Sequence, residues 1–150
     1  MNKKKMIIHL QKQFNLSVPE QGETIRLNVW GRPFDVKVCY SLFEGETVMD
    51  HAVMLGAIRK FLSKSTKLIS DCKSEVEKSI IEDSEGEVTK VDNIFKYIIP
   101  KNLYVHYDSQ HPNDRLISIE CNYKFDPSHG RCLLWTNEQF IGCVKDDPNS

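Results

Sequence analysis

Hydrophobic and polar positions alternate most regularly in residues 116–144, close to the C-terminal end of the chain. In residues 116–125 every second position is apolar or aromatic, which is the period of a strand with one buried face. The polar run that follows, residues 126–130, is typical of a turn. Two shorter apolar runs, residues 131–135 and 139–144, come next with a polar break between them. The pattern predicts an antiparallel meander of three strands, on which the rest of the chain packs.

The same alternation occurs earlier in the chain. Residues 25–29 and 34–40 both have period 2, and the short connection between them contains Gly and Pro, so the pair predicts a β-hairpin. Residues 103–107 predict one more strand. Residues 6–18 fit either a helix face or a strand, and Pro19 would end both.

The middle of the chain has helical periodicity. The clearest helix has Thr47 as its expected N-cap and one continuous apolar stripe. Residues 68–80 carry a second stripe, and two such helices in succession predict an αα-hairpin laid on the sheet. A short third helix is expected over residues 93–99, capped by Asp92 and stopped by Pro100.

These elements predict an α+β fold. We expect an antiparallel β-sheet of about five to six strands, built from the N-terminal hairpin and the C-terminal meander, with two to three helices packed on one face. At 150 residues the chain is long enough for one domain with its own core. We therefore expect a single domain over residues 1–150, flexible ends at residues 1–5 and 145–150, and an acidic loop at residues 82–91.

Composition indicates an ordinary soluble protein, with 40% hydrophobic and 27% charged residues. No apolar run approaches the roughly 20 residues of a membrane helix. The N-terminal lysines are followed by no signal-peptide core, so we expect a cytoplasmic location and no membrane partner. The cysteines are odd in number and widely spaced, which indicates free thiols packed as small apolar groups. They are Cys39, Cys72, Cys121, Cys132 and Cys143.

Charge is unevenly distributed although the net charge is only −1. Residues 71–92 contain eight acidic residues and three lysines. This segment is either a solvated helix face that runs into a polar loop, or an acidic docking surface for a basic partner. Because it would repel phosphate, and because the only basic cluster is the terminal Lys3, Lys4 and Lys5, we expect no nucleic-acid partner.

The sequence contains few candidates for a metal site. The nearest approach to one is His106 and His111, with Asp108 and Asp114 nearby. The chain has neither a paired C-x-x-C nor two histidines one helical turn apart, which are the spacings that zinc sites favour. We therefore expect no metal and no cofactor.

A hydrolase would need carboxylates or a histidine that converge on one pocket. Asp126, His129 and Glu120 are close in sequence around the turn of the meander, and they are the best candidates. Glu120 is expected on the face opposite Tyr123, and Asp126 followed by Pro127 is normal turn chemistry. We therefore expect no catalytic residue and no enzymatic activity.

One run of residues resembles a known group of proteins. A Trp-Gly turn between two strands, then a helix pair and a further strand, precede the pattern C-x-x-x-F-D-P-x-H-G. The turn consists of Trp30 and Gly31. The fixed positions of the pattern are Cys121, Phe125, Asp126, Pro127, His129 and Gly130. This arrangement resembles small bacterial proteins, some of which are the immunity proteins of polymorphic toxins, including those of contact-dependent growth inhibition. The resemblance implies an α+β cytoplasmic domain without catalysis.

The resemblance and the charge pattern together predict a function. We expect an immunity protein that binds and neutralises a cognate toxin by direct contact, with a nuclease-type toxin whose basic surface meets an acidic one. The expected partner-binding residues are Asp71, Glu75, Glu82, Asp83, Glu85 and Glu87. Two alternatives stay open: a small hydrolase with its site near Asp126 and His129, and a non-catalytic adaptor domain without a toxin partner.

Overall fold

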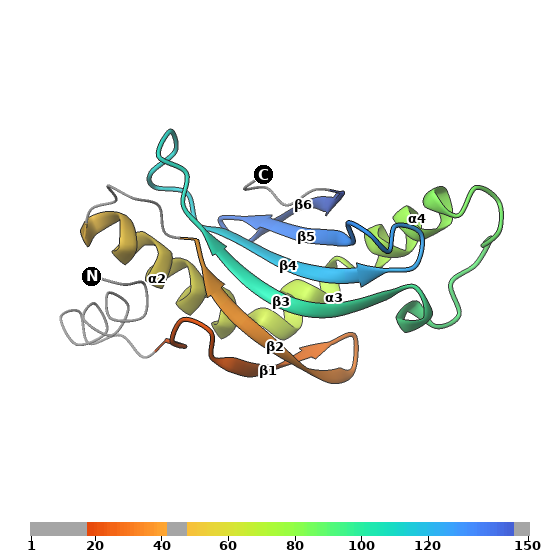
Figure 1. Cartoon of the computed structure of the whole chain (residues 1–150), viewed down its shortest axis with the longest axis horizontal. Helices are drawn as coiled ribbons and strands as arrows, with labels where there is room; N and C mark the ends of the chain where they lie inside the picture. Colours follow the sequence, from red (N-terminus) through yellow and green to blue (C-terminus); the bar gives the residue numbers. More distant parts are fainter. Residues whose placement is uncertain (1–17, 42–47, 146–150) are drawn as a thin grey trace.

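The structure is a computed structural model that describes residues 18–41 and 48–145. Within these residues the chain forms one six-stranded sheet and three α-helices, so the expected α+β class is confirmed (Figure 1). The elements, in chain order, are β1 (Thr24–Val29), β2 (Arg32–Tyr40), α2 (Val48–Ser63), α3 (Ser65–Asp71), α4 (Lys73–Asp83), the 3₁₀ turn η1 (Ile94–Lys96), β3 (Ile98–His106), β4 (Leu116–Tyr123), β5 (Arg131–Thr136) and β6 (Gln139–Val144).

The strands lie in the sheet in the order in which they occur in the chain, from β1 to β6. All neighbours are antiparallel except β2 and β3, which run parallel, so the sheet is mixed and not antiparallel throughout. A parallel pair needs a long crossover connection. Helices α2, α3 and α4 supply it, because all three lie between β2 and β3 in the chain.

The hairpin and the meander are found where the sequence predicts them. β1 pairs with β2, and β4 pairs with β5, where Ile117 lies opposite Trp135 and Ile119 opposite Leu133. These four side chains belong to the face of the sheet that carries the helices, and all are buried. The parity of the hydrophobic positions therefore sets both the register and the buried face.

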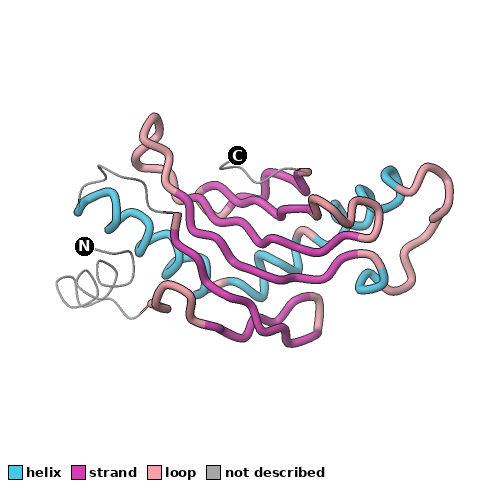
Figure 2. The backbone as a smooth tube through the Cα atoms, viewed as in Figure 1, coloured by secondary structure: helices cyan, strands magenta, loops and turns pink. Residues whose placement is uncertain are grey.

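The three helices follow one another along one side of the sheet and do not turn back on themselves (Figures 1 and 2). α2 contacts β3 and β4, α3 contacts β1, and α4 contacts β6. The predicted αα-hairpin is therefore wrong. Only Lys64 separates α2 from α3, and only Cys72 separates α3 from α4. A reversal needs a loop of about two to five residues, and a single residue allows only a bend.

The third predicted helix is also wrong. Residues 94–96 form only the 3₁₀ turn η1, and Asn93, not Asp92, caps it by accepting a hydrogen bond at Oδ1 from Phe95 N (3.1 Å). β3 then begins at Ile98 and contains Pro100. The register with β4 shifts between Pro100 and the next paired residue, and proline is tolerated in a strand at such a bulge because no ladder bond needs its missing N–H.

The core lies between the helices and the inner face of the sheet. Phe61 of α2 packs edge-on against Trp135 of β5, with ring centres 5.1 Å apart, and both are fully buried. Trp30, in the β1–β2 turn, donates from Nε1 to the carbonyl of Ile69 in α3 (2.9 Å). Burial of each such side chain contributes about 1.5–3 kcal/mol. These contacts hold helices α2 and α3 against the sheet.

The acidic loop is shorter than predicted, because α4 continues to Asp83 and the loop begins at Ser84. The Ser84 hydroxyl accepts a hydrogen bond from Val88 N (2.9 Å), and the Val88 side chain is buried. The start of the loop is therefore tied to the end of the helix. The predictions for residues 1–17, for Thr47 and for residues 146–150 lie outside the described residues.

Candidate functional site

A chain of polar contacts joins the end of α4 to the β4–β5 hairpin. Asp83 accepts from the hydroxyl of Tyr123 (2.7 Å) and from Nη2 of Arg131 (3.3 Å). Arg131 also donates from Nη1 to Asp126 Oδ2 (3.1 Å), and its guanidinium carbon lies 4.6 Å from the centre of the Tyr123 ring. Asp83 is thus a link between helix and sheet, which the sequence does not reveal.

Two members of this cluster, Tyr123 and Asp126, have pKa values that favour the protonation states their contacts require. Burial, and then the hydrogen bond to Asp83, raise the pKa of Tyr123, so the phenol keeps the proton that it donates. The hydrogen bond from His129, and then that from Arg131, hold the pKa of Asp126 below its usual range. The cluster is therefore a stable ionic link near neutral pH.

The residues that carry the resemblance form a tight turn between β4 and β5. Asp126 Oδ1 accepts from the backbone N–H of His129 (3.3 Å) and lies 3.0 Å from its Nδ1. The backbone of Gly130 has a φ of +72°, and a Cβ there would overlap the carbonyl oxygen of Cys121. The distinctive Asp-Pro-Ser-His-Gly sequence thus has a structural explanation, which is the shape of this turn.

The candidate hydrolase residues do not converge. Glu120 accepts from Asn102 Nδ2 (3.0 Å) on the face of β4 opposite to Tyr123, as predicted. The Asp126 carboxylate is held by His129 and Arg131 on the helix side of the sheet. The three side chains therefore do not share one pocket, which a hydrolytic site would require.

The candidate metal ligands are also separated. His106 is buried in β3, with Nε2 2.7 Å from Ser118 Oγ, whereas His111 lies in an exposed loop with Nδ1 2.9 Å from Asp108 Oδ2. In residues 18–41 and 48–145 no three His, Cys, Asp or Glu side chains are grouped in a way that could hold a metal ion.

All five cysteines are free thiols, as predicted. Burial raises the pKa of Cys72 to about 12 and that of Cys143 to about 11. Since the thiolate is the nucleophile, these side chains are unreactive near neutral pH and pack as small apolar groups.

Four of the six predicted partner-binding residues form an exposed acidic surface. Glu75 and Glu82 lie two helical turns apart on α4, away from its buried residues, and Glu85 and Glu87 follow in the adjoining loop. We call these four residues the acidic ridge. Within the described part of the chain, none of them has an ion-pair partner.

The two remaining predicted residues, Asp71 and Asp83, differ from the ridge. Asp71 is exposed at the end of α3 and pairs with Lys67 (2.8 Å), which offsets its charge. Asp83 is held by Tyr123 and Arg131. Asp83 is therefore part of the contact between helix and sheet, whereas the four ridge residues are exposed to solvent.

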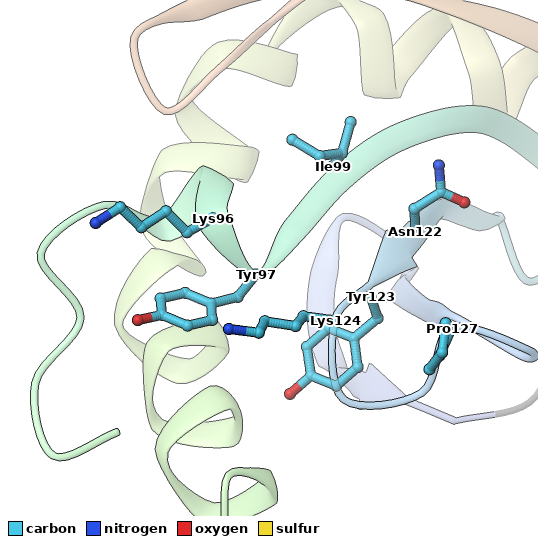
Figure 3. Close-up of a pocket in the computed structure, with 7 residues that line it drawn as sticks. All are labelled: Lys96, Tyr97, Ile99, Asn122, Tyr123, Lys124 and Pro127. Atoms are coloured by element: carbon cyan, nitrogen blue, oxygen red, sulfur yellow. The ribbon is translucent and has the colours of Figure 1, made fainter. Parts of the chain in front are cut away.

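A shallow hollow of about 300 Å³ opens beside Tyr123 (Figure 3). It is lined by Lys96, Tyr97, Ile99, Asn122, Tyr123, Lys124 and Pro127, and we call it the basic hollow. Tyr97 and Phe125 stack with ring centres 5.8 Å apart, and Lys124 Nζ lies 5.6 Å and 5.8 Å from these two centres. Sequence reasoning missed this site. Its only sequence signal is a lysine beside an aromatic residue at two places, and the pairing of β3 with β4 brings the two together.

Comparisons of the chain with protein-family models, with curated proteins and with solved structures find no match. Among the described helices, none combines the length and the hydrophobicity needed to cross a bilayer.

Proposed function

We propose that this chain is an immunity protein that acts in the cytoplasm, where it binds and neutralises a cognate bacterial toxin by direct contact. The proposed partner is a nuclease-type toxin domain with a basic surface. One observation carries the proposal. The acidic ridge presents Glu75, Glu82, Glu85 and Glu87 to solvent without a neutralising partner in the described residues.

The position of these carboxylates supports a role in binding. The C-terminal end of a helix carries partial negative charge, so acidic residues there are unfavourable and basic ones favourable. α4 has no basic residue in its last turn, which instead contains Glu82 and Asp83. Arg131 offsets the charge of Asp83, whereas Glu82 has no ion-pair partner among residues 18–41 and 48–145. An arrangement that opposes helix stability is expected where the charge serves another purpose.

The ridge is also held in place before any partner arrives. Asp83 anchors the end of α4 to β5 through Arg131, and Ser84 fixes the start of the loop through Val88. A surface that is already ordered loses less conformational entropy on binding. This suits an inhibitor, which has to associate fast and stay bound.

The mechanism needs no chemistry from this chain. A nuclease holds the phosphate backbone of its substrate in a basic groove. An ordered row of carboxylates is complementary to such a groove in potential, and complementarity of this kind speeds encounter and suppresses wrong partners. Occupation of the groove by the ridge would exclude the nucleic acid.

Co-purification tests the proposal directly. The full chain is co-expressed with the product of the neighbouring reading frame, one of the two carrying a tag. We expect a 1:1 complex by size-exclusion chromatography, and growth arrest when the neighbouring product is expressed without this chain. A neighbouring product that neither arrests growth nor binds would contradict the proposal.

A further inference from the structure

The basic hollow lies close to the end of α4, which carries part of the acidic ridge. Tyr123 connects the two regions, because it is one of the residues that line the hollow and its hydroxyl donates to Asp83 at the end of α4 (2.7 Å). Pro127, on another wall of the hollow, follows Asp126, which shares Arg131 with Asp83. The ridge residues Glu82 and Glu85 lie within two positions of Asp83. The end of α4 and the hollow are therefore neighbours, and a partner that covers Glu82 and Glu85 can extend over the edge of the sheet to the hollow.

The lining of the hollow combines apolar and cationic groups. Ile99, Pro127 and the ring of Tyr97 supply the apolar part, and Lys96 and Lys124 supply two ammonium groups (Figure 3). In residues 18–41 and 48–145 neither lysine has a carboxylate within ion-pair distance.

One of the lysines is held in position. Lys124 Nζ lies over both rings of the Tyr97–Phe125 stack, and its backbone N–H donates to the Tyr97 carbonyl (2.8 Å). A cation over an aromatic ring gains about 0.5–1 kcal/mol at an exposed site. The positive charge that Lys124 contributes to the hollow is thus partly ordered before anything binds.

We propose that the basic hollow receives an acidic side chain of the protein partner, together with an adjoining apolar or aromatic residue. This inference rests on the proposed function and adds a requirement to it. The toxin surface has to carry a carboxylate beside its basic groove, so that both signs of charge are matched.

Charge complementarity selects this occupant. Nucleic acid would place phosphates against Lys96 and Lys124, but its backbone would then run beside Glu82 and Glu85 and be repelled. A protein can place charges of both signs within one interface. The lysines therefore add specificity, because a uniformly basic protein that approached the ridge would meet two like charges at the hollow.

A peptide titration of the full chain tests the chemistry of the hollow without the toxin. The probes are acetyl-Phe-Glu-amide and acetyl-Phe-Gln-amide, followed by ¹H–¹⁵N NMR at low salt. We expect shifts at Lys96, Tyr97, Asn122 and Lys124, and at least about fivefold tighter binding of the glutamate peptide. Equal affinity for the two peptides, or shifts elsewhere only, would overturn the inference.

Matched variants make the titration specific. Lys96→Gln with Lys124→Gln should abolish the preference for the glutamate peptide. Lys60→Gln with Lys64→Gln makes the same change of charge at exposed positions on and after α2, and should preserve the preference. A preference that survives in the first pair would show that the hollow is not the site.

The complex of this chain with the co-purified toxin provides a second test of the hollow. Lys96→Glu with Lys124→Glu should weaken binding of the co-purified toxin by about thirtyfold or more, whereas Lys60→Glu with Lys64→Glu should leave it unchanged. An unchanged affinity for the first pair would overturn the inference and leave the proposed function standing. If the neighbouring product fails to bind at all, the proposed function fails, and the peptide preference alone decides the chemistry of the hollow.

Discussion

Arg131, at the first position of β5, forms an ion pair of 3.3 Å with Asp83, at the last position of α4, although 48 residues separate them in sequence. The pair fixes the end of the helix that carries the acidic ridge. It also positions Tyr123, whose ring packs against the guanidinium and which is one of the residues that line the basic hollow. One arginine thus holds both parts of the proposed binding surface.

Loss of this arginine should destabilise the fold. In Arg131→Met, Asp83 and Asp126 keep their charges in a half-buried site without their cation, so we expect a decrease of about 2 kcal/mol in the free energy of unfolding, measured in urea. The matched control is Arg26→Met, which removes an exposed ion pair with Asp35 (3.1 Å) and should cost less than about 0.5 kcal/mol. Equal losses in the two variants would contradict a special role for Arg131.

The turn after β4 should require glycine at position 130. Gly130→Ala places a Cβ against the Cys121 carbonyl oxygen in a left-handed backbone conformation, so we expect a loss of about 2–4 kcal/mol in thermal or urea unfolding. Gly86→Ala is the control, because Gly86 also has a positive φ (+91°) but an added Cβ meets nothing within 4 Å. It should cost only about 1 kcal/mol. A similar cost at both positions would show that the contact with Cys121 is unimportant.

Stability should fall at alkaline pH because of the buried thiols. In the unfolded chain Cys72 and Cys143 ionise near pH 9.0, whereas burial raises their pKa values in the folded protein to about 12 and about 11. The free energy of unfolding is therefore unaffected by these two thiols below pH 9. As the pH rises from 9 toward 11, each thiol lowers the free energy of unfolding by about 1.4 kcal/mol per pH unit. Urea unfolding at pH 8, 9, 10 and 11 measures this slope.

The double variant Cys72→Ala with Cys143→Ala controls the alkaline prediction. It should be less stable than the native chain at pH 8, because it leaves small cavities, but its stability should fall less steeply above pH 9. A slope identical to that of the native chain would assign the alkaline loss to other groups.

Periodicity was sufficient to predict most of the sheet. Ile117, Ile119 and Tyr123 recur with period 2 because one face of β4 is buried, and that burial is what the pattern reports. The parallel pairing of β2 with β3 is not encoded in either strand, since it depends on the path of the three intervening helices. Local pattern does not predict the 3₁₀ turn or the early start of β3, because a proline such as Pro100 favours the end of a helix, whereas here it lies at a bulge within a strand.

The candidate site was predictable only in part. Exposed carboxylates such as Glu82 and Glu85 are visible as a run of acidic residues, so the ridge could be named from the sequence. The structural role of Asp83 could not, because its partner Arg131 lies in another element. The basic hollow needs Lys96 and Lys124 to meet across two strand ends, and no local pattern contains that information.

The most direct test of the proposed function is the association rate of the chain with its toxin when the ridge is neutralised. The ridge variant combines the substitutions Glu82→Gln, Glu85→Gln and Glu87→Gln. It changes the net charge by about +3 and keeps the shape of the side chains. The control Ser109→Lys, Gln110→Lys and Asn113→Lys makes the same change in the exposed β3–β4 loop, at the opposite end of the sheet (Figure 1).

Stopped-flow measurements over a range of salt concentrations compare the two variants. We predict that the ridge variant associates about tenfold more slowly than the native chain at low salt and has a flatter salt dependence, while the control variant keeps the native rate to within about twofold. Equal rates and equal salt slopes for the two variants would contradict binding through the acidic ridge.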